Sequence, residues 1–105
     1  MEKEQVALAL HEMLPVVIRA ARKHLGISRI EPIEESIKSR IFNIFDKQEL
    51  KELLQHCCFC LFEAEVFLEQ GKVDKAMRWL CWVQGNMHAL GVMSIYQGQK
   101  QNQPH

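Results

Sequence analysis

The sequence predicts an all-α protein, an antiparallel four-helix bundle with a kinked first helix and a short C-terminal turn. Apolar residues recur at three- and four-residue spacing through most of the chain. Gly and Pro number only five and three in 105 residues, too few for an all-β chain with many tight turns. This length suits one domain, which we place at residues 1–97. Ser94 with Gln97 resembles a capping box that opens the terminal turn, and a flexible polar tail is expected at 98–105.

The first helix is expected at residues 3–25. Gly26 follows it as a natural left-handed C-terminal residue. Pro15 removes one backbone donor and crowds the carbonyl of His11, so a kink or break is expected near residues 11–15. The apolar stripe of this helix consists of Val6, Leu10, Met13, Leu14, Val17, Ala21 and Leu25.

A second helix is expected at residues 32–45. Pro32 fits its first turn, where the missing N–H costs nothing. Its apolar stripe consists of Ile33, Ile37, Ile41, Ile44 and Phe45.

The third helix, at residues 47–70, has the clearest start in the chain. Asp46 can accept from the backbone of Glu49 and Glu49 can reach back, which makes a capping box. Phe45 before the cap and Leu50 after it are spaced as a hydrophobic staple. Apolar residues cover more than one side of this helix, which predicts a central position in the bundle. They are Leu50, Leu53, Leu54, Cys57, Leu61, Ala64 and Leu68 on one stripe, with Phe59, Phe62 and Val66 beside it.

The fourth helix is expected at residues 73–90, between Gly71 and Gly91. Its inner face consists of Ala76, Met77, Leu80, Val83, Gln84 and Met87, with Trp79 and Cys81 near the borders. Gly85 lies inside the helix, where Gly costs roughly 1 kcal/mol relative to Ala. We expect that cost to be offset by the close approach of another backbone.

Charge and hydropathy exclude several classes of protein. Thirteen Lys plus Arg balance thirteen Asp plus Glu, so the net charge does not indicate a nucleic acid or a membrane as partner. No apolar run approaches the roughly 20 residues of a membrane-spanning helix. The first five residues lack the basic and apolar regions of a signal peptide. We therefore expect a soluble intracellular protein.

A sulfur-rich stretch at residues 56–60 raises the possibility of a metal or redox site. His56, Cys57 and Cys60 share neighbouring positions on a helix, and Cys81 and His88 on the next helix could complete a four-ligand zinc site. The sequence has no paired C-x-x-C knuckle, however, and thiols are often buried. Reduced thiols without a disulfide, and no metal, cofactor or catalytic residue, are the prediction.

Two tryptophans three residues apart, Trp79 and Trp82, lie side by side on the predicted fourth helix. They can fill the core, anchor a subunit interface, or stack a base beside Arg78, Lys75 and Tyr96. A second group of cations gathers near the end of the first helix: Arg19, Arg22, Lys23 and Arg29. That group can contact phosphate or an acidic partner, but an interaction with the helix dipole is the simpler interpretation.

The last third of the chain resembles the C-terminal signature of small uncharacterised proteins encoded by tailed bacteriophages and prophages. The resemblance covers residues 74–104 and rests on Ala76-Met77-Arg78-Trp79-Leu80, Val83-Gln84-Gly85, Leu90-Gly91, Ser94-Ile95, Asn102 and Pro104. The chain departs from that group at Cys81-Trp82, where Gly and Phe are common. The resemblance implies a bacterial cytoplasm, an accessory role for a phage and no established activity.

These observations lead to the hypothesis of a non-enzymatic phage accessory protein that binds another protein, such as a host or defence factor, and forms a homodimer. The expected interface consists of Phe59, Phe62, Val66, Trp79, Trp82 and Gly85. One alternative is a nucleotide or nucleic-acid binding module that uses Trp82, Tyr96, Arg78 and Lys75. The other alternative is the Cys/His metal or redox module.

Overall fold

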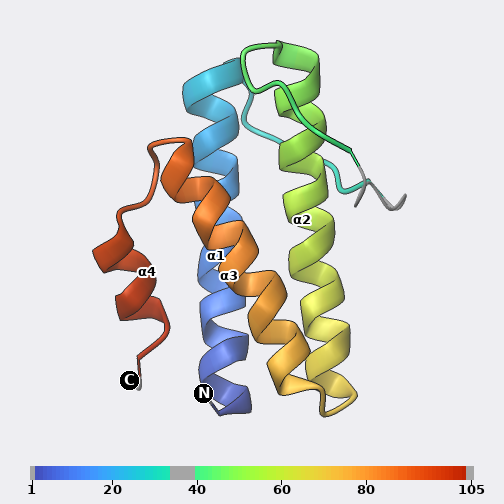
Figure 1. Cartoon of the computed structure of the whole chain (residues 1–105), viewed down its shortest axis with the longest axis vertical. Helices are drawn as coiled ribbons and strands as arrows, with labels where there is room; N and C mark the ends of the chain where they lie inside the picture. Colours follow the sequence, from blue (N-terminus) through green and yellow to red (C-terminus); the bar gives the residue numbers. More distant parts are fainter. Residues whose placement is uncertain (1, 34–39, 104–105) are drawn as a thin grey trace.

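The computed structural model describes residues 2–33 and 40–103, and this part of the chain contains four helices. They are α1 (Lys3–Leu25), α2 (Lys47–Glu69), α3 (Val73–Ala89) and α4 (Ile95–Gln101). None of the described residues lies in a strand, and the all-α class is confirmed. Successive helices run in opposite directions, so that α1 and α3 point one way and α2 and α4 the other (Figure 1).

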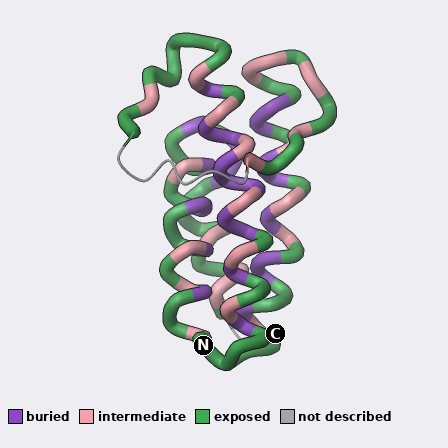
Figure 2. The backbone as a smooth tube through the Cα atoms, turned by 90° about the vertical axis from the view of Figure 1, so that its right-hand side faces the viewer, coloured by how far each residue is buried: buried purple, intermediate pink, exposed green. Residues whose placement is uncertain are grey.

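The core lies between the three long helices, each of which packs against the other two. Its deepest side chains include Val6, Leu10, Met13, Val17, Leu54, Leu80, Val83 and Met87. Buried positions follow the inward side of each long helix, and exposed positions follow the outward side (Figure 2). The periodicity of the sequence therefore locates these three helices correctly. In the described residues, no helix is long and apolar enough to cross a membrane.

Pro15 does not end the first helix. α1 continues through it as one element from Lys3 to Leu25, so the predicted break does not occur. Proline leaves the carbonyl of His11 without its helical donor, but both His11 and Pro15 are exposed. Water can satisfy that carbonyl on the outer side of the helix, which explains why the helix tolerates this proline.

The predicted helix at residues 32–45 is wrong for the described residues in that range. Residues 32–33 and 40–45 are not helical, and the remainder, 34–39, lies outside the described part. Ile41 and Phe45, which the pattern places on a buried stripe, are 92% and 93% exposed. At residues 40–45, the spacing of the isoleucines therefore does not indicate a buried face of a helix. The predicted staple between Phe45 and Leu50 does not form.

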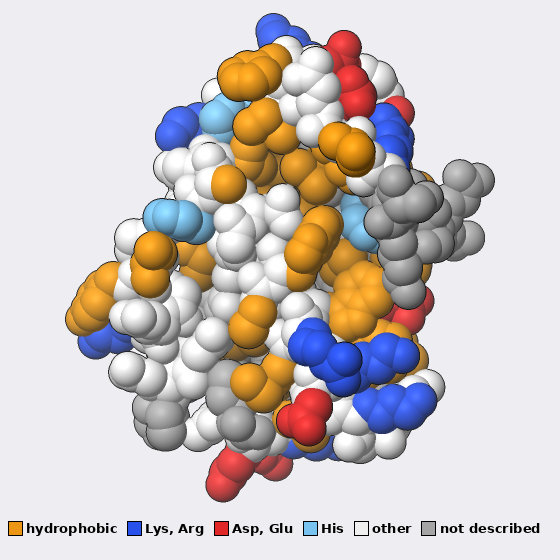
Figure 3. Space-filling model, in the orientation of Figure 1, with side chains coloured by type: hydrophobic (Ala, Val, Ile, Leu, Met, Phe, Trp, Pro, Cys, Tyr) orange, Lys and Arg blue, Asp and Glu red, His pale blue; other side chains and the backbone are white. Residues whose placement is uncertain are grey.

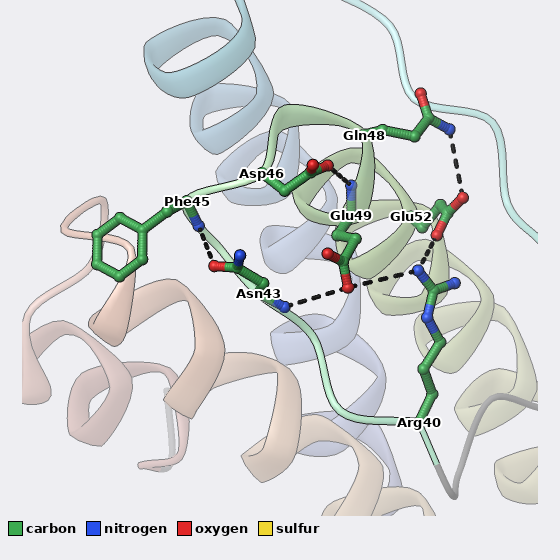
Figure 4. Close-up of polar contacts among 7 residues, drawn as sticks. All are labelled: Arg40, Asn43, Phe45, Asp46, Gln48, Glu49 and Glu52. Atoms are coloured by element: carbon green, nitrogen blue, oxygen red, sulfur yellow. Dashed lines mark hydrogen bonds and ion pairs between the residues drawn. The ribbon is translucent and has the colours of Figure 1, made fainter.

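Local side-chain hydrogen bonds replace the helix at residues 43–46 (Figure 4). The side chain of Asn43 accepts from the backbone N–H of Phe45 at 3.1 Å, and the carbonyl of Asn43 accepts from Asp46 at 3.1 Å. Such bonds compete with helical bonds for the same backbone groups. The resulting turn positions Asp46, which accepts from the N–H of Glu49 at 2.9 Å and caps α2 as predicted. Glu49 itself accepts from the N–H of Asn43 at 3.3 Å, so the second half of the predicted box is absent.

The first residues of the predicted tail lie in a helix. Ser94 and Gln97 form the expected capping box at 3.0 and 2.8 Å, but α4 runs to Gln101, beyond the predicted start of the tail at residue 98. The buried amide of Gln84 on α3 donates to Gln101 and Asn102 at 3.0 and 2.9 Å. These bonds tie the end of α4 to α3. They also stabilise the fold, because the buried amide of Gln84 would be costly without a partner.

Two cations and a histidine of α1 bind the backbone that follows α3. They are Arg19, Lys23 and His24, and in that order they contact the carbonyl oxygens of Val92, Gly91 and Leu90 at 3.2, 3.0 and 2.6 Å. The last carbonyls of a helix have no helical donor and carry partial negative charge. Leu90 is the C-cap of α3, and Gly91 and Val92 follow it, so these contacts join α1 to the segment after α3. Lys23 and His24 also lie in the last turn of α1, where the predicted interaction with the dipole of that helix stays a prediction. Arg29 forms an exposed ion pair with Glu31 at 3.2 Å.

Candidate functional site: a pocket of aromatic and arginine side chains

A pocket of about 390 Å³ opens between α2, α3 and the extended residues 40–42. Its described lining consists of Arg40, Phe42, His56, Cys60, Arg78, Trp79 and Trp82, and we call it the aromatic–arginine pocket. On the face shown in Figure 3, exposed hydrophobic side chains lie over the middle of the molecule and a cluster of Lys and Arg lies below them. The pocket therefore combines apolar walls with positive charge.

Helical spacing and one ion pair bring the lining residues together. His56 and Cys60 are one turn apart on α2, and Trp79 and Trp82 are three residues apart on α3. The segment at residues 40–42 is held against α2 by Arg40, whose guanidinium pairs with Glu52 and lies 3.8 Å from Glu49 (Figure 4). Three separate parts of the chain thus build the pocket.

His56 lies at the centre of the aromatic wall and is 5% exposed. The ring of Phe59 stacks on it, with centroids 5.9 Å apart and planes at 19°. Trp82 meets it edge-on at 5.4 Å and Trp79 lies at 6.5 Å. The Sγ atom of Cys60 is 3.6 Å from Nε2 of His56. Because both indoles contact this buried ring, the aromatic wall exists before any ligand arrives.

The two tryptophans differ in their surroundings. Trp79 is half-buried, packs against the core and lies 6.2 Å from the ring of Phe67. Trp82 is 42% exposed. One indole therefore serves mainly the fold, and the other presents surface to solvent at the pocket.

The two arginines of the pocket also differ. Arg40 is engaged by Glu52, whose pKa lies below its ordinary value because Gln48 and Arg40 donate hydrogen bonds to the carboxylate. Arg78 is exposed and has no ion-pair partner among the described residues. Arg78 is therefore the cation of the pocket that can pair with an incoming anion.

Two lysines extend the positive charge beyond Arg78. Lys72, Lys75 and Arg78 follow one another at three-residue intervals at the start of α3, and with Asp74 they line a hollow at the α2–α3 turn. The Nζ atom of Lys75 lies 4.4 Å from the centre of the Phe67 ring. We call these three cations the α3 cation stripe; in the described part of the chain none of them forms an ion pair.

The cysteines form no disulfide and do not assemble a metal site within the described residues, to which all four belong. Burial raises the pKa of Cys57 well above its usual value, and raises that of Cys58 to about 11. Cys81 is exposed, and Nδ1 of His88 lies 3.0 Å from the carbonyl oxygen of Met93. The four-ligand set considered from the sequence is therefore not brought together.

The residues of the predicted dimer interface fall in different places. Phe59, Phe62 and Val66 share the outer side of α2, with Phe62 and Val66 47% and 43% exposed. Gly85 instead lines a hollow between α3 and α4, and a Cβ atom there would meet nothing within 4 Å. The close backbone approach expected at Gly85 is therefore not made within this chain. Self-association through these residues stays a prediction.

The residues of the predicted stacking site are also divided. Arg78 and Trp82 both line the pocket. Tyr96, by contrast, lies on α4, is 64% exposed and is not among the described lining residues.

Sequence reasoning missed Arg40 and Phe42 as pocket residues, because it placed them in a helix. It considered His56 and Cys60 as metal ligands, with Cys60 as a buried thiol in the favoured interpretation, and not as part of a pocket. The spacing of His56 and Cys60 showed that they share a helix face, but not which helix covers that face.

Comparison with protein-family models, with curated proteins and with solved structures finds no match to this chain. The chemistry of the aromatic–arginine pocket is the basis for the function proposed below.

Proposed function

We propose that this chain is a non-enzymatic accessory protein of a bacteriophage or prophage that binds a partner protein through the aromatic–arginine pocket. The observation that carries the proposal is the pair formed by a solvent-exposed Trp82 and an Arg78 without an ion pair to any described residue, over a buried aromatic wall. Tryptophan and arginine dominate the energetics of protein interfaces when they are preorganised in this way. The phage setting rests on the resemblance of residues 74–104.

The size of the pocket supports a side-chain ligand. A volume of about 390 Å³ lies at the lower end of the range for small-molecule sites, roughly 300–1,000 Å³. One or two side chains of a partner fill such a volume, and flanking segments then lie on the surrounding surface.

Nucleotide binding is the second candidate, because Arg78 and Trp82 also suit a phosphate beside a base. Two observations weigh against it. Tyr96 is not part of the pocket, so the predicted stacking platform lacks one ring. Glu49 and Glu52 occupy Arg40 at its end of the pocket, so this cation is not available to a second phosphate of a nucleic-acid strand.

Selection of peptides tests the proposal. A bead-displayed library of random heptapeptides is selected against the native chain, and each enriched peptide is measured by fluorescence titration. Trp82→Ala is expected to weaken these peptides at least tenfold, because it removes the exposed anchor. Phe45→Ala, which truncates an exposed ring that does not line the pocket, is the control and is expected to leave binding unchanged.

Two outcomes contradict the proposal. One is a set of enriched peptides that bind Trp82→Ala as tightly as the native chain. The other is the absence of any enriched peptide while a mononucleotide or a short single-stranded oligonucleotide binds in a Trp82-dependent manner, which supports the second candidate. Circular dichroism shows that each variant keeps its helices.

A further inference from the structure

We infer that the partner is held by an acidic side chain beside a large apolar one, with the carboxylate paired to Arg78 and the apolar group on Trp82 and Phe42. This inference rests on the proposed function and names the chemistry of its ligand. It follows from how the charges in and around the pocket are used.

The negative charges of the described site are already engaged by Arg40. Glu52 pairs with Arg40, and Glu49 lies 3.8 Å from the same guanidinium and also accepts from Asn43. No acidic side chain among the described residues lines the pocket itself. Among the described residues, therefore, no carboxylate in the pocket competes with an incoming anion for Arg78.

The positive charges on the other side of the pocket have no ion-pair partner in the part of the chain that the structure describes. The α3 cation stripe contributes three cations against one acid, Asp74, at the same hollow, and Figure 3 shows basic side chains gathered beside exposed hydrophobic ones. A carboxylate at Arg78 would also lie in the field of Lys75, one turn away. Charge complementarity thus favours an acidic ligand at this edge.

The walls of the pocket determine what lies beside the acid. Trp82, Trp79 and Phe42 supply flat apolar surface within the same cavity as Arg78. A guanidinium binds a carboxylate through two parallel hydrogen bonds, so it fixes the direction of the bound side chain. A neighbouring leucine or aromatic side chain then covers the indole of Trp82.

The pattern favours a peptide over a nucleic acid. A nucleic-acid strand gains affinity from several phosphates along an extended basic groove. Here the cations form one short stripe at the start of a single helix, and the chain has no net charge. The site is therefore suited to one or two anions.

The experiment uses two matched libraries of acetylated and amidated heptapeptides, one with glutamate fixed at the central position and one with glutamine. Both are tested on the full chain. We expect enriched peptides from the glutamate library only, with apolar residues next to the acid. Exchange of glutamate for glutamine in the best peptide is expected to raise Kd about tenfold or more, since it removes a charge-assisted pair.

Two variants locate the effect. Arg78→Gln is expected to abolish the preference for glutamate, and it should fold because Arg78 is exposed. Lys51→Gln makes the same change of charge at an exposed position of α2 that lines none of the hollows described above. We expect this control to keep the preference.

The outcomes separate the two proposals. Peptides that need Trp82 but bind equally well with glutamine overturn the acidic ligand and leave the proposed function standing. A preference for glutamate that survives Arg78→Gln overturns the assignment of the carboxylate to Arg78. Failure of every peptide to depend on Trp82 overturns the proposed function as well.

Discussion

The molecule carries two groups of cations that resemble each other in sequence and differ completely in use. Near the end of α1, two cations and a histidine contact three successive backbone carbonyls after α3. At the start of α3, the α3 cation stripe of Lys72, Lys75 and Arg78 has no ion-pair partner among the described residues. The first group holds two helices together, and the second remains available to a ligand.

The difference arises from which helix end each group meets. The carbonyls of residues 90–92, at and just after the C-cap of α3, accept hydrogen bonds and so stabilise the cations of α1 there. The start of α3 presents N–H groups and partial positive charge, which cannot satisfy a cation. Topology, rather than the number of basic residues, therefore decides whether a cluster is structural or available for binding.

Removal of each group tests this comparison, and the α1 group gives the largest expected effect. The triple variant Arg19→Ala, Lys23→Ala and His24→Ala leaves three carbonyls without these donors and is expected to lower the free energy of unfolding by about 2–3 kcal/mol. The matched triple variant Lys72→Ala, Lys75→Ala and Arg78→Ala is expected to cost less than about 1 kcal/mol. Urea denaturation measures both. Equal losses would contradict the distinction.

Substitution of two glycines sharpens the comparison: Gly91 lies beside the α1 contacts, and Gly85 lies away from them. Gly91 has φ +75°, and a Cβ atom there would lie 3.0 Å from Nζ of Lys23. Gly91→Ala is expected to destabilise the chain by about 1 kcal/mol. Gly85 lies in a helix with open space around it, so Gly85→Ala is expected to stabilise the chain by roughly 0.5–1 kcal/mol. If thermal unfolding shows that both variants are less stable than the native chain, the assignment of open space at Gly85 is contradicted.

The smallest expected effect is the pH dependence of the stability that the Arg40–Glu52 ion pair contributes. The lowered pKa of Glu52 means that its pairing stabilises the fold above the ordinary value near 4.5 and that this stabilisation is lost as pH falls through the lowered value. The native protein is expected to have a higher free energy of unfolding than the Glu52→Gln variant at pH 7, and the same free energy of unfolding at acid pH. Urea denaturation across pH 3–7 measures the difference. A difference that is independent of pH would contradict an ionic Arg40–Glu52 contact.

The sequence predicts the long helices well, because α1, α2 and α3 each bury a periodic apolar stripe. It fails at residues 40–45, where isoleucine spacing suggests a helix but the bonds of Asn43 form a turn. It also finds half of the pocket. Arg78, Trp79 and Trp82 are recognisable because they share a helix, whereas Arg40 and Phe42 come from a segment whose path depends on an ion pair to α2. Contacts of that kind cannot be deduced from periodicity.

The central claim is that Arg78 is the cation that meets the ligand, and exchange of charge tests it most directly. Isothermal titration compares the best glutamate peptide with its lysine counterpart on the native chain and on Arg78→Glu. We expect the native chain to prefer the glutamate peptide and Arg78→Glu to prefer the lysine peptide, because the sign of the charge at the pocket is reversed. An unchanged preference for glutamate in Arg78→Glu would contradict the claim.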